Sequence, residues 1–269
     1  MLTKNTQVIE TDKRVDSDIG EVSFTNHLFE RLAAKSKTFS RVDFSHSTFD
    51  ACYLRKCVFD SCDFTGCRFI GTNLVGSTFS GCRFDYATFE RTHIENEILD
   101  TECPAYENLK MRFARSLRVN YQQLGDTVSA NKAIGVELAA TELHLYNVWQ
   151  SNSSYYRKKY KGIIRIRAWF QWLNFKILDY VWGNGESTTK LARTLIFLFA
   201  VMTAIDVIQY RDVSLVSSYF SAFVEAPQIF LGASVPLHYP KFYLTLIILL
   251  RLIAFGFLMA IIVKRFNRR

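Results

Sequence analysis

Apolar side chains recur at every fifth position through the first hundred residues. The unbroken run comprises Phe39, Phe44, Phe49, Leu54, Phe59, Phe64, Phe69, Leu74, Phe79, Phe84, Phe89, Ile94 and Leu99. The register extends backwards through Phe29, Phe24 and Ile19, with only Ala34 weak. Neither an α-helix nor a flat strand has this period. A unit this short cannot bury its own apolar face, so the pattern predicts a solenoid of stacked copies.

A small residue lies two positions before each apolar centre from Ser47 to Ala87. Some units, such as Cys62-Asp63-Phe64-Thr65-Gly66 and Thr72-Asn73-Leu74-Val75-Gly76, match the motif of a known family: a small residue, an Asp or Asn, a central Leu or Phe, and two polar residues. Over residues 19–100 this pattern resembles the pentapeptide-repeat family. The resemblance implies a right-handed quadrilateral β-helix with four pentapeptides per coil. Residues twenty apart should then stack as three phenylalanine columns and one aliphatic column.

Three cysteines at this spacing, Cys57, Cys62 and Cys67, raise the question of a metal site or a cross-link. They occupy the small-residue position, and successive members fall on different sides of the expected coil. Four zinc ligands would have to converge on one point, so we expect no metal. The N-terminus lacks an apolar leader, which predicts a cytoplasmic, reducing location and no disulfide bonds.

The periodicity becomes helical after Pro104. Leu109, Phe113 and Leu117 predict one helix, and Gly125-Asp126 can end it and cap the next. We therefore divide the chain into an N-terminal segment (1–18), the solenoid (19–100) and a helical hairpin connector (101–150) that covers the solenoid's end.

Residues 151–190 form a basic and aromatic linker. The segment from Arg157 to Arg167 lies next to Trp169 and Phe170, which is typical of an amphipathic helix at a membrane surface. The residues expected to meet lipid head groups are Arg157, Lys158, Lys159, Lys161, Arg165 and Arg167, together with Lys264 and Arg265 near the C-terminus. A nucleic-acid patch is the alternative interpretation.

Residues 191–269 are predicted to form a membrane domain. Two apolar spans, 191–210 and 241–263, are long enough to cross a bilayer. Their basic flanks place both termini in the cytoplasm by the positive-inside rule. The segment 215–236 is too apolar for a solvated loop, and we interpret it as a re-entrant helix followed by irregular backbone. A multi-pass protein of a bacterial inner membrane is expected.

This half of the chain is similar to two-transmembrane potassium-channel-type pore domains, specifically those of bacterial proteins that also carry pentapeptide repeats. The resemblance lies in Tyr121-Gln-Gln-Leu-Gly-Asp126, Glu137, Trp182-Gly183-Asn-Gly185-Glu186, Ser218-Tyr-Phe-Ser221 and Leu231-Gly232. Potassium filters carry a second glycine and an aromatic residue, whereas here Gly232 is followed by Ala-Ser-Val-Pro236. A degenerate, less selective pore is implied, with Glu225, Gln228, Gly232 and Ser234 as pore-lining candidates.

Arg251 lies near the middle of the second span, where an arginine needs a partner. Asp206 and Glu225 are the acidic candidates, and the hypothesis is that Arg251 pairs with one of them and holds the pore closed or shapes its entrance. The alternative is that Arg251 forms a structural bond between helices.

The leading function is a homo-oligomeric ion channel, with a tetramer favoured by the resemblance. Its cytoplasmic part would dock a regulatory protein or nucleotide signal, as in an anti-phage effector that depolarises the membrane. The alternative is a membrane-anchored scaffold that recruits a partner without conducting ions.

Charge and side-chain chemistry exclude other classes. The net charge of +8 is uneven, because residues 1–100 hold twelve Lys and Arg against fifteen Asp and Glu. That weak acidity argues against DNA mimicry, a role of some pentapeptide-repeat proteins. The five histidines are scattered and no nucleophile, base and orienting group occur together, so we expect neither an enzyme nor a cofactor.

Overall fold

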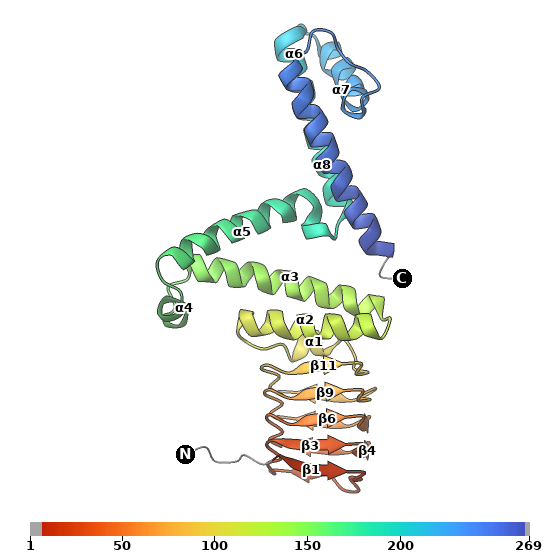
Figure 1. Ribbon diagram of the computed structural model, residues 1–269, viewed down its shortest axis with the longest axis vertical. Helices are drawn as coiled ribbons and strands as arrows, with labels where there is room; N and C mark the ends of the chain where they lie inside the picture. The colour runs from red at the N-terminus through yellow and green to blue at the C-terminus, as the bar shows by residue number, and fades with distance from the viewer. Residues whose placement is uncertain (1–6, 267–269) are drawn as a thin grey trace. The chain divides into compact units, whose positions relative to one another are not determined.

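The computed structural model describes residues 7–266, with side chains described as far as Lys264. The chain divides into two compact units between Trp169 and Phe170. The first unit contains the solenoid and its helical cover, and the second contains the long apolar helices (Figure 1).

The solenoid consists of short parallel strands. They are β1 (Val8–Thr11), β2 (Ile19–Gly20), β3 (His27–Glu30), β4 (Ala33–Lys35), β5 (Thr38–Ser40), β6 (Thr48–Asp50), β7 (Tyr53–Arg55), β8 (Val58–Asp60), β9 (Arg68–Ile70), β10 (Thr78–Ser80) and β11 (Thr88–Glu90). Phe39 pairs with Phe59 and Phe49 with Phe69, each in parallel register. One sheet has the order β1-β3-β6-β9-β11 and another β10-β8-β5-β2. The pairing of residues twenty apart confirms a parallel β-solenoid of about four turns.

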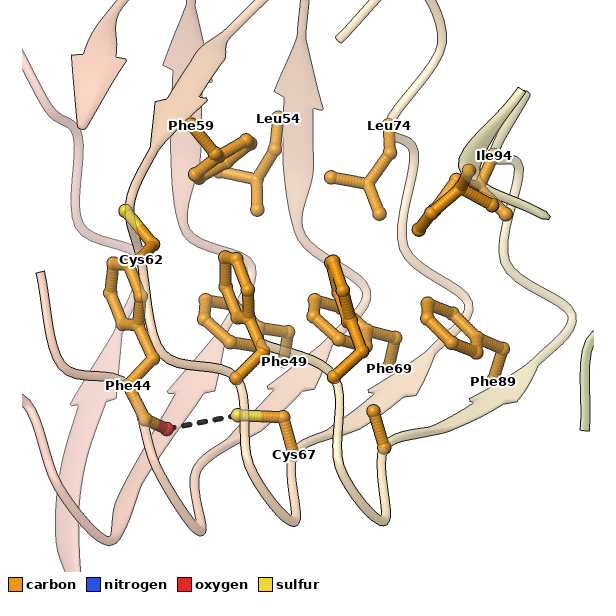
Figure 2. Packing of buried hydrophobic residues seen from close by; sticks show 14 of the residues in the cluster. Phe44, Phe49, Leu54, Phe59, Cys62, Cys67, Phe69, Leu74, Phe89 and Ile94 are labelled. Carbon is orange, nitrogen blue, oxygen red and sulfur yellow. Dashed lines mark hydrogen bonds between the residues drawn. The ribbon is translucent and has the colours of Figure 1, made fainter. Parts of the chain in front are cut away.

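The apolar centres form the columns that the sequence predicts. Figure 2 shows Phe49, Phe69 and Phe89 in one row, with Leu54, Leu74 and Ile94 in another. The rings of Phe49 and Phe69 stack with centroids 5.0 Å apart and planes within 5°, and Phe69 stacks on Phe89 in the same way. Such aromatic pairs contribute about 0.5–1.5 kcal/mol each beyond the area that they bury. The interior of each coil thus serves as the template for the next.

The first coil starts earlier than the predicted boundary at residue 19. β1 pairs with β3 so that Glu10 lies opposite Phe29, a separation of nineteen rather than twenty residues. The side containing Val15 is therefore one residue shorter than the others, and Glu10 occupies a central position. The period of five is lost at this point, although the parallel pairing continues.

Three helices cover the other end of the solenoid: α1 (Ile98–Thr101), α2 (Glu107–Gln123) and α3 (Thr127–Gln150). Leu99 belongs to α1 and not to a further pentapeptide repeat as its register predicts, but its side chain still packs in the solenoid core. The fully buried Asn120 accepts a hydrogen bond from the Thr92 backbone N–H (2.7 Å) and donates one to the Thr92 carbonyl (2.8 Å). The amide of Asn120 thereby replaces the next strand for the last turn of the solenoid.

Helix α4 (Ser154–Lys159) follows α3, and α5 (Ile163–Trp182) passes from the first unit into the second. The second unit continues with η1 (Gly183–Gly185), α6 (Thr188–Tyr210), α7 (Val216–Leu231) and α8 (Lys241–Phe266). Two segments, Thr188–Tyr210 and Lys241–Lys264, are long and apolar enough to cross a membrane. In the most apolar stretch of the first segment only 28% is buried within the chain, and in that of the second only 11%.

Candidate functional site

Arg211 joins the end of α6 to the middle of α7. Its Nε donates to Asp206 Oδ2 at 2.5 Å, its Nη1 to Ser221 Oγ at 2.7 Å and its Nη2 to Glu225 Oε2 at 2.6 Å. The Asp206 side chain is only 4% exposed, whereas that of Glu225 is 45% exposed. The buried carboxylate is therefore the member of this network that depends most on its partner.

The same carboxylate also holds the chain that enters α8. Tyr239 donates its hydroxyl to Asp206 Oδ1 at 2.8 Å, and His238 Nε2 lies 3.6 Å from that oxygen. Residues just before α7 and just before α8 thus meet at one buried group. We refer to Asp206, Arg211, Glu225 and Tyr239 as the entrance network.

Helix α7 runs from the entrance network back along α6. Near its C-terminal end the Phe230 ring packs on that of Phe199, with centroids 5.5 Å apart. The helix ends at Gly232, whose φ of 83° is left-handed. A Cβ at this position would overlap the Arg251 Nη1, so both the backbone conformation and the close guanidinium favour glycine. Because Arg251 lies ten residues into α8, the end of α7 reaches about 15 Å along that helix.

The expected pairing of Arg251 with Asp206 or Glu225 is wrong. Both carboxylates pair with Arg211, and no ion pair to Arg251 occurs within the described side chains. Arg251 instead lies against the C-terminal end of α7, where the negative end of the helix dipole favours a cation. It borders a pocket of about 420 Å³ lined by Thr188, Leu191, Ala192, Leu195, Phe230, Leu231, Ala254, Phe255 and Leu258.

The four pore-lining candidates lie on α7 and the segment after it. Glu225 is held by Arg211, and Gln228 is exposed on the same helix. The Gln228 carbonyl accepts the backbone N–H groups of Ala233 (2.8 Å) and Ser234 (3.3 Å), which turns the chain away from the helix axis. Gly232 is exposed and Ser234 half-buried. Their role in a pore stays a prediction.

The Trp182–Glu186 turn packs on the last part of α8. The Trp182 ring stacks on Phe257 with centroids 4.3 Å apart, and Glu186 forms an ion pair with Lys264. Gly183 and Gly185 are both buried with positive φ, and Asn184 between them is also left-handed (φ 51°). The contact engages Lys264, one of the residues predicted to meet lipid. The side chain of Arg265 lies outside the described residues.

Three of the basic linker residues have intramolecular partners. Arg157 Nη2 donates to the Val148 carbonyl at 3.0 Å, and Arg165 Nη2 donates to the Trp149 carbonyl at 2.9 Å. Both carbonyls lie in the last turn of α3, where the helix leaves acceptors unpaired. Lys159 donates to the Tyr155 hydroxyl at 3.1 Å. Lys158, Lys161 and Arg167 are exposed, so lipid contact stays a prediction that best fits these three.

The regularly spaced cysteines are free thiols that bond to the solenoid backbone. Cys67 Sγ donates to the Phe44 carbonyl at 2.9 Å (Figure 2), and Cys62 Sγ to the Phe39 carbonyl at 3.3 Å. Burial raises the pKa of Cys67 to about 12 and that of Cys52 to about 11, which keeps both thiols protonated. Among the described residues no group of three or more His, Cys, Asp or Glu is placed to hold a metal ion.

Comparison with known proteins places the first unit in context. Residues 33–100 match the family described as "Pentapeptide repeat region". These residues are a pentapeptide repeat region. Two trypsin-treated forms of QnrB1, a plasmid-mediated fluoroquinolone resistance protein, are similar solved structures, each with 15% sequence identity.

The similarity to QnrB1 is partial. The first match has a TM-score of 0.19 and covers 34% of this chain and 64% of the QnrB1 chain. This protein therefore spans less than two thirds of the QnrB1 chain in that match. The second covers 32% and 79% with a TM-score of 0.11. No curated protein matches the sequence.

Proposed function

We propose that this protein is a homo-oligomeric membrane pore, with a tetramer favoured, whose pentapeptide repeat region and helical cover dock a cytoplasmic regulator. The second unit forms the membrane domain. Helices α6 and α8 are its spans, and α7 is a re-entrant pore helix.

The course of α7 is the observation that carries the proposal. Arg211 and Tyr239, at the two ends of the segment 211–239, meet at Asp206, while Gly232 between them reaches Arg251 in α8. A chain that enters and leaves on the same side of two spans places irregular backbone at the depth of the hydrocarbon. Such backbone is tolerated only beside protein or water.

The exposed apolar surface of α8 supports the same assignment. Leu246, Leu252 and Leu258 are 42%, 63% and 38% exposed and point in three directions about 120° apart around the helix. A helix that is apolar on all sides requires lipid or further copies of the chain around it. One copy with two spans cannot enclose a conduit, so the pore requires several copies.

Flux through the purified full-length protein in liposomes tests the proposal. We expect the wild-type protein to pass ions. The variant Trp182→Ala should change the magnitude of the ion flux or its regulation, because the Trp182–Glu186 turn contacts α8. The control is Ile177→Ala, which truncates a side chain that is 52% exposed on the preceding helix α5 and should leave the flux unchanged. A folded, membrane-inserted oligomer without flux under any condition would refute the pore. It would leave the membrane-anchored scaffold as the function to pursue.

A further inference from the structure

We propose that the pore conducts anions and that Arg251 is the residue that selects them. The inference rests on the proposed pore function and names the class of ion that passes.

The acidic groups of the second unit have other partners. Asp206 and Glu225 bind Arg211, and Asp179 accepts two hydrogen bonds from Lys190 at 2.8 Å. Glu186 binds Lys264, and Asp212 accepts from Ser214. Within the described side chains, Arg251 has no carboxylate to neutralise it. A guanidinium at membrane depth needs a counter-charge, and here a mobile anion is the species that can supply it.

Arg251 lies where the proposed conduit contains irregular backbone. Its guanidinium abuts Gly232, which is exposed and begins the segment leading to Tyr239. The surrounding pocket of about 420 Å³ is apolar apart from Thr188 and Arg251 itself. Apolar walls lower the local dielectric constant and strengthen the attraction between a fixed cation and a passing anion.

The direction of α7 also affects the sign of the charge beside Gly232. Its C-terminal end carries a partial negative charge of about half an electron, which by itself would favour a cation. The full positive charge of Arg251 at the same place reverses that sign. Several copies arranged around an axis would form a ring of guanidinium groups, which is the arrangement that selects anions.

The reversal potential of the full-length protein in planar bilayers, with unequal KCl on the two sides, tests the proposal. We expect the wild-type current to reverse near the chloride equilibrium potential. Arg251→Gln should lower the chloride-to-potassium permeability ratio by about tenfold or more, because one unit charge is lost beside the ion path. Arg251→Lys should keep the preference for chloride. Lys241→Gln, which removes a charge from the exposed start of the same helix, should change it little.

The outcomes separate the two proposals. A wild-type current that reverses near the potassium equilibrium potential overturns anion selectivity while leaving the pore intact. Chloride preference unchanged in an assembled Arg251→Gln protein overturns the role of Arg251. A complete lack of current from the folded wild-type oligomer removes the pore and anion conduction together. The wild-type measurement does not depend on whether any variant folds.

Discussion

Replacement of Arg211 by Leu should destabilise the second unit mainly through one of its three contacts. The Asp206 carboxylate is 4% exposed, and removing its cation leaves a buried charge, which costs about 3–5 kcal/mol. The Glu225 carboxylate is 45% exposed, so water replaces its partner at a cost of about 0–1 kcal/mol. We therefore expect Arg211→Leu to cost several kcal/mol and Glu225→Gln less than about 1 kcal/mol.

A compensating change separates charge burial from lost packing. Asp206→Asn removes the negative charge but keeps an acceptor for the Tyr239 hydroxyl, 2.8 Å away in the wild type. The double variant Asp206→Asn with Arg211→Leu should therefore recover more than half of the stability that Arg211→Leu loses. The coupling energy of the two positions follows from the double-mutant cycle.

Stability is best measured by pulse proteolysis in increasing dodecyl sulfate, with mass spectrometry of the fragments. Fragments from residues 170–264 report the second unit separately from the solenoid. Two results would refute the reasoning: a cost for Arg211→Leu no greater than that for Glu225→Gln, or no recovery in the double variant. Either would mean that burial of the Asp206 charge does not cause most of the lost stability.

Three further predictions concern the first unit. Asn120→Leu leaves the buried Thr92 N–H and carbonyl without partners, at about 1–3 kcal/mol each, so amide exchange near Thr92 should accelerate at least tenfold. Gln123→Ala removes an exposed hydrogen bond to the Arg91 backbone N–H and should change the amide exchange rate little. Equal effects of Asn120→Leu and Gln123→Ala would contradict this prediction. Burial raises the pKa of the Asp126 carboxyl, but hydrogen bonds from Ser129 and Val128 at the start of α3 outweigh it, so this pKa lies below its ordinary value. The stability that this helix cap contributes should be complete above the ordinary pKa of an aspartate, and it should be lost as pH falls through the lower pKa of Asp126 in the folded protein. Asp126→Ala should remove about 1 kcal/mol of stability, measured in thermal melts, and this loss should vanish at low pH. Iodoacetamide at neutral pH should spare Cys67 in the folded protein and modify it in guanidinium, whereas modification of the folded form would show that the thiol is accessible.

The solenoid could be predicted because each of its sides buries one central side chain, which imposes the period directly on the sequence. The exceptions follow from the same rule. Glu10 and the short side containing Val15 broke the period at the first coil. Leu99 kept the period but belongs to a helix, because an apolar residue facing the core satisfies either structure.

Partners within the second unit could not be predicted from the order of residues alone. The two apolar segments were visible from length and hydropathy, but Arg211 was overlooked because it lies just beyond the first. Its position five residues after Asp206 was a usable signal, since a carboxylate at a span end needs a nearby cation. Similarly, the carbonyls at the end of α3 needed donors, which accounts for Arg157 and Arg165.

The thiol-to-carbonyl hydrogen bonds of the solenoid can also be made by a hydroxyl group. Ser77 at the same repeat position donates to the Leu54 carbonyl at 2.6 Å, and Thr72 donates to the Phe49 carbonyl at 3.0 Å, so a hydroxyl performs the task of a thiol there. Serine can therefore replace cysteine in these columns with the backbone bonds retained. Cys103 lies outside these columns and donates to the Leu99 carbonyl at 3.1 Å, so it must be replaced as well. A protein cleared of its own thiols in this way could then carry a single spectroscopic probe beside Gly232, which would allow movement of the segment after α7 to be followed in a bilayer.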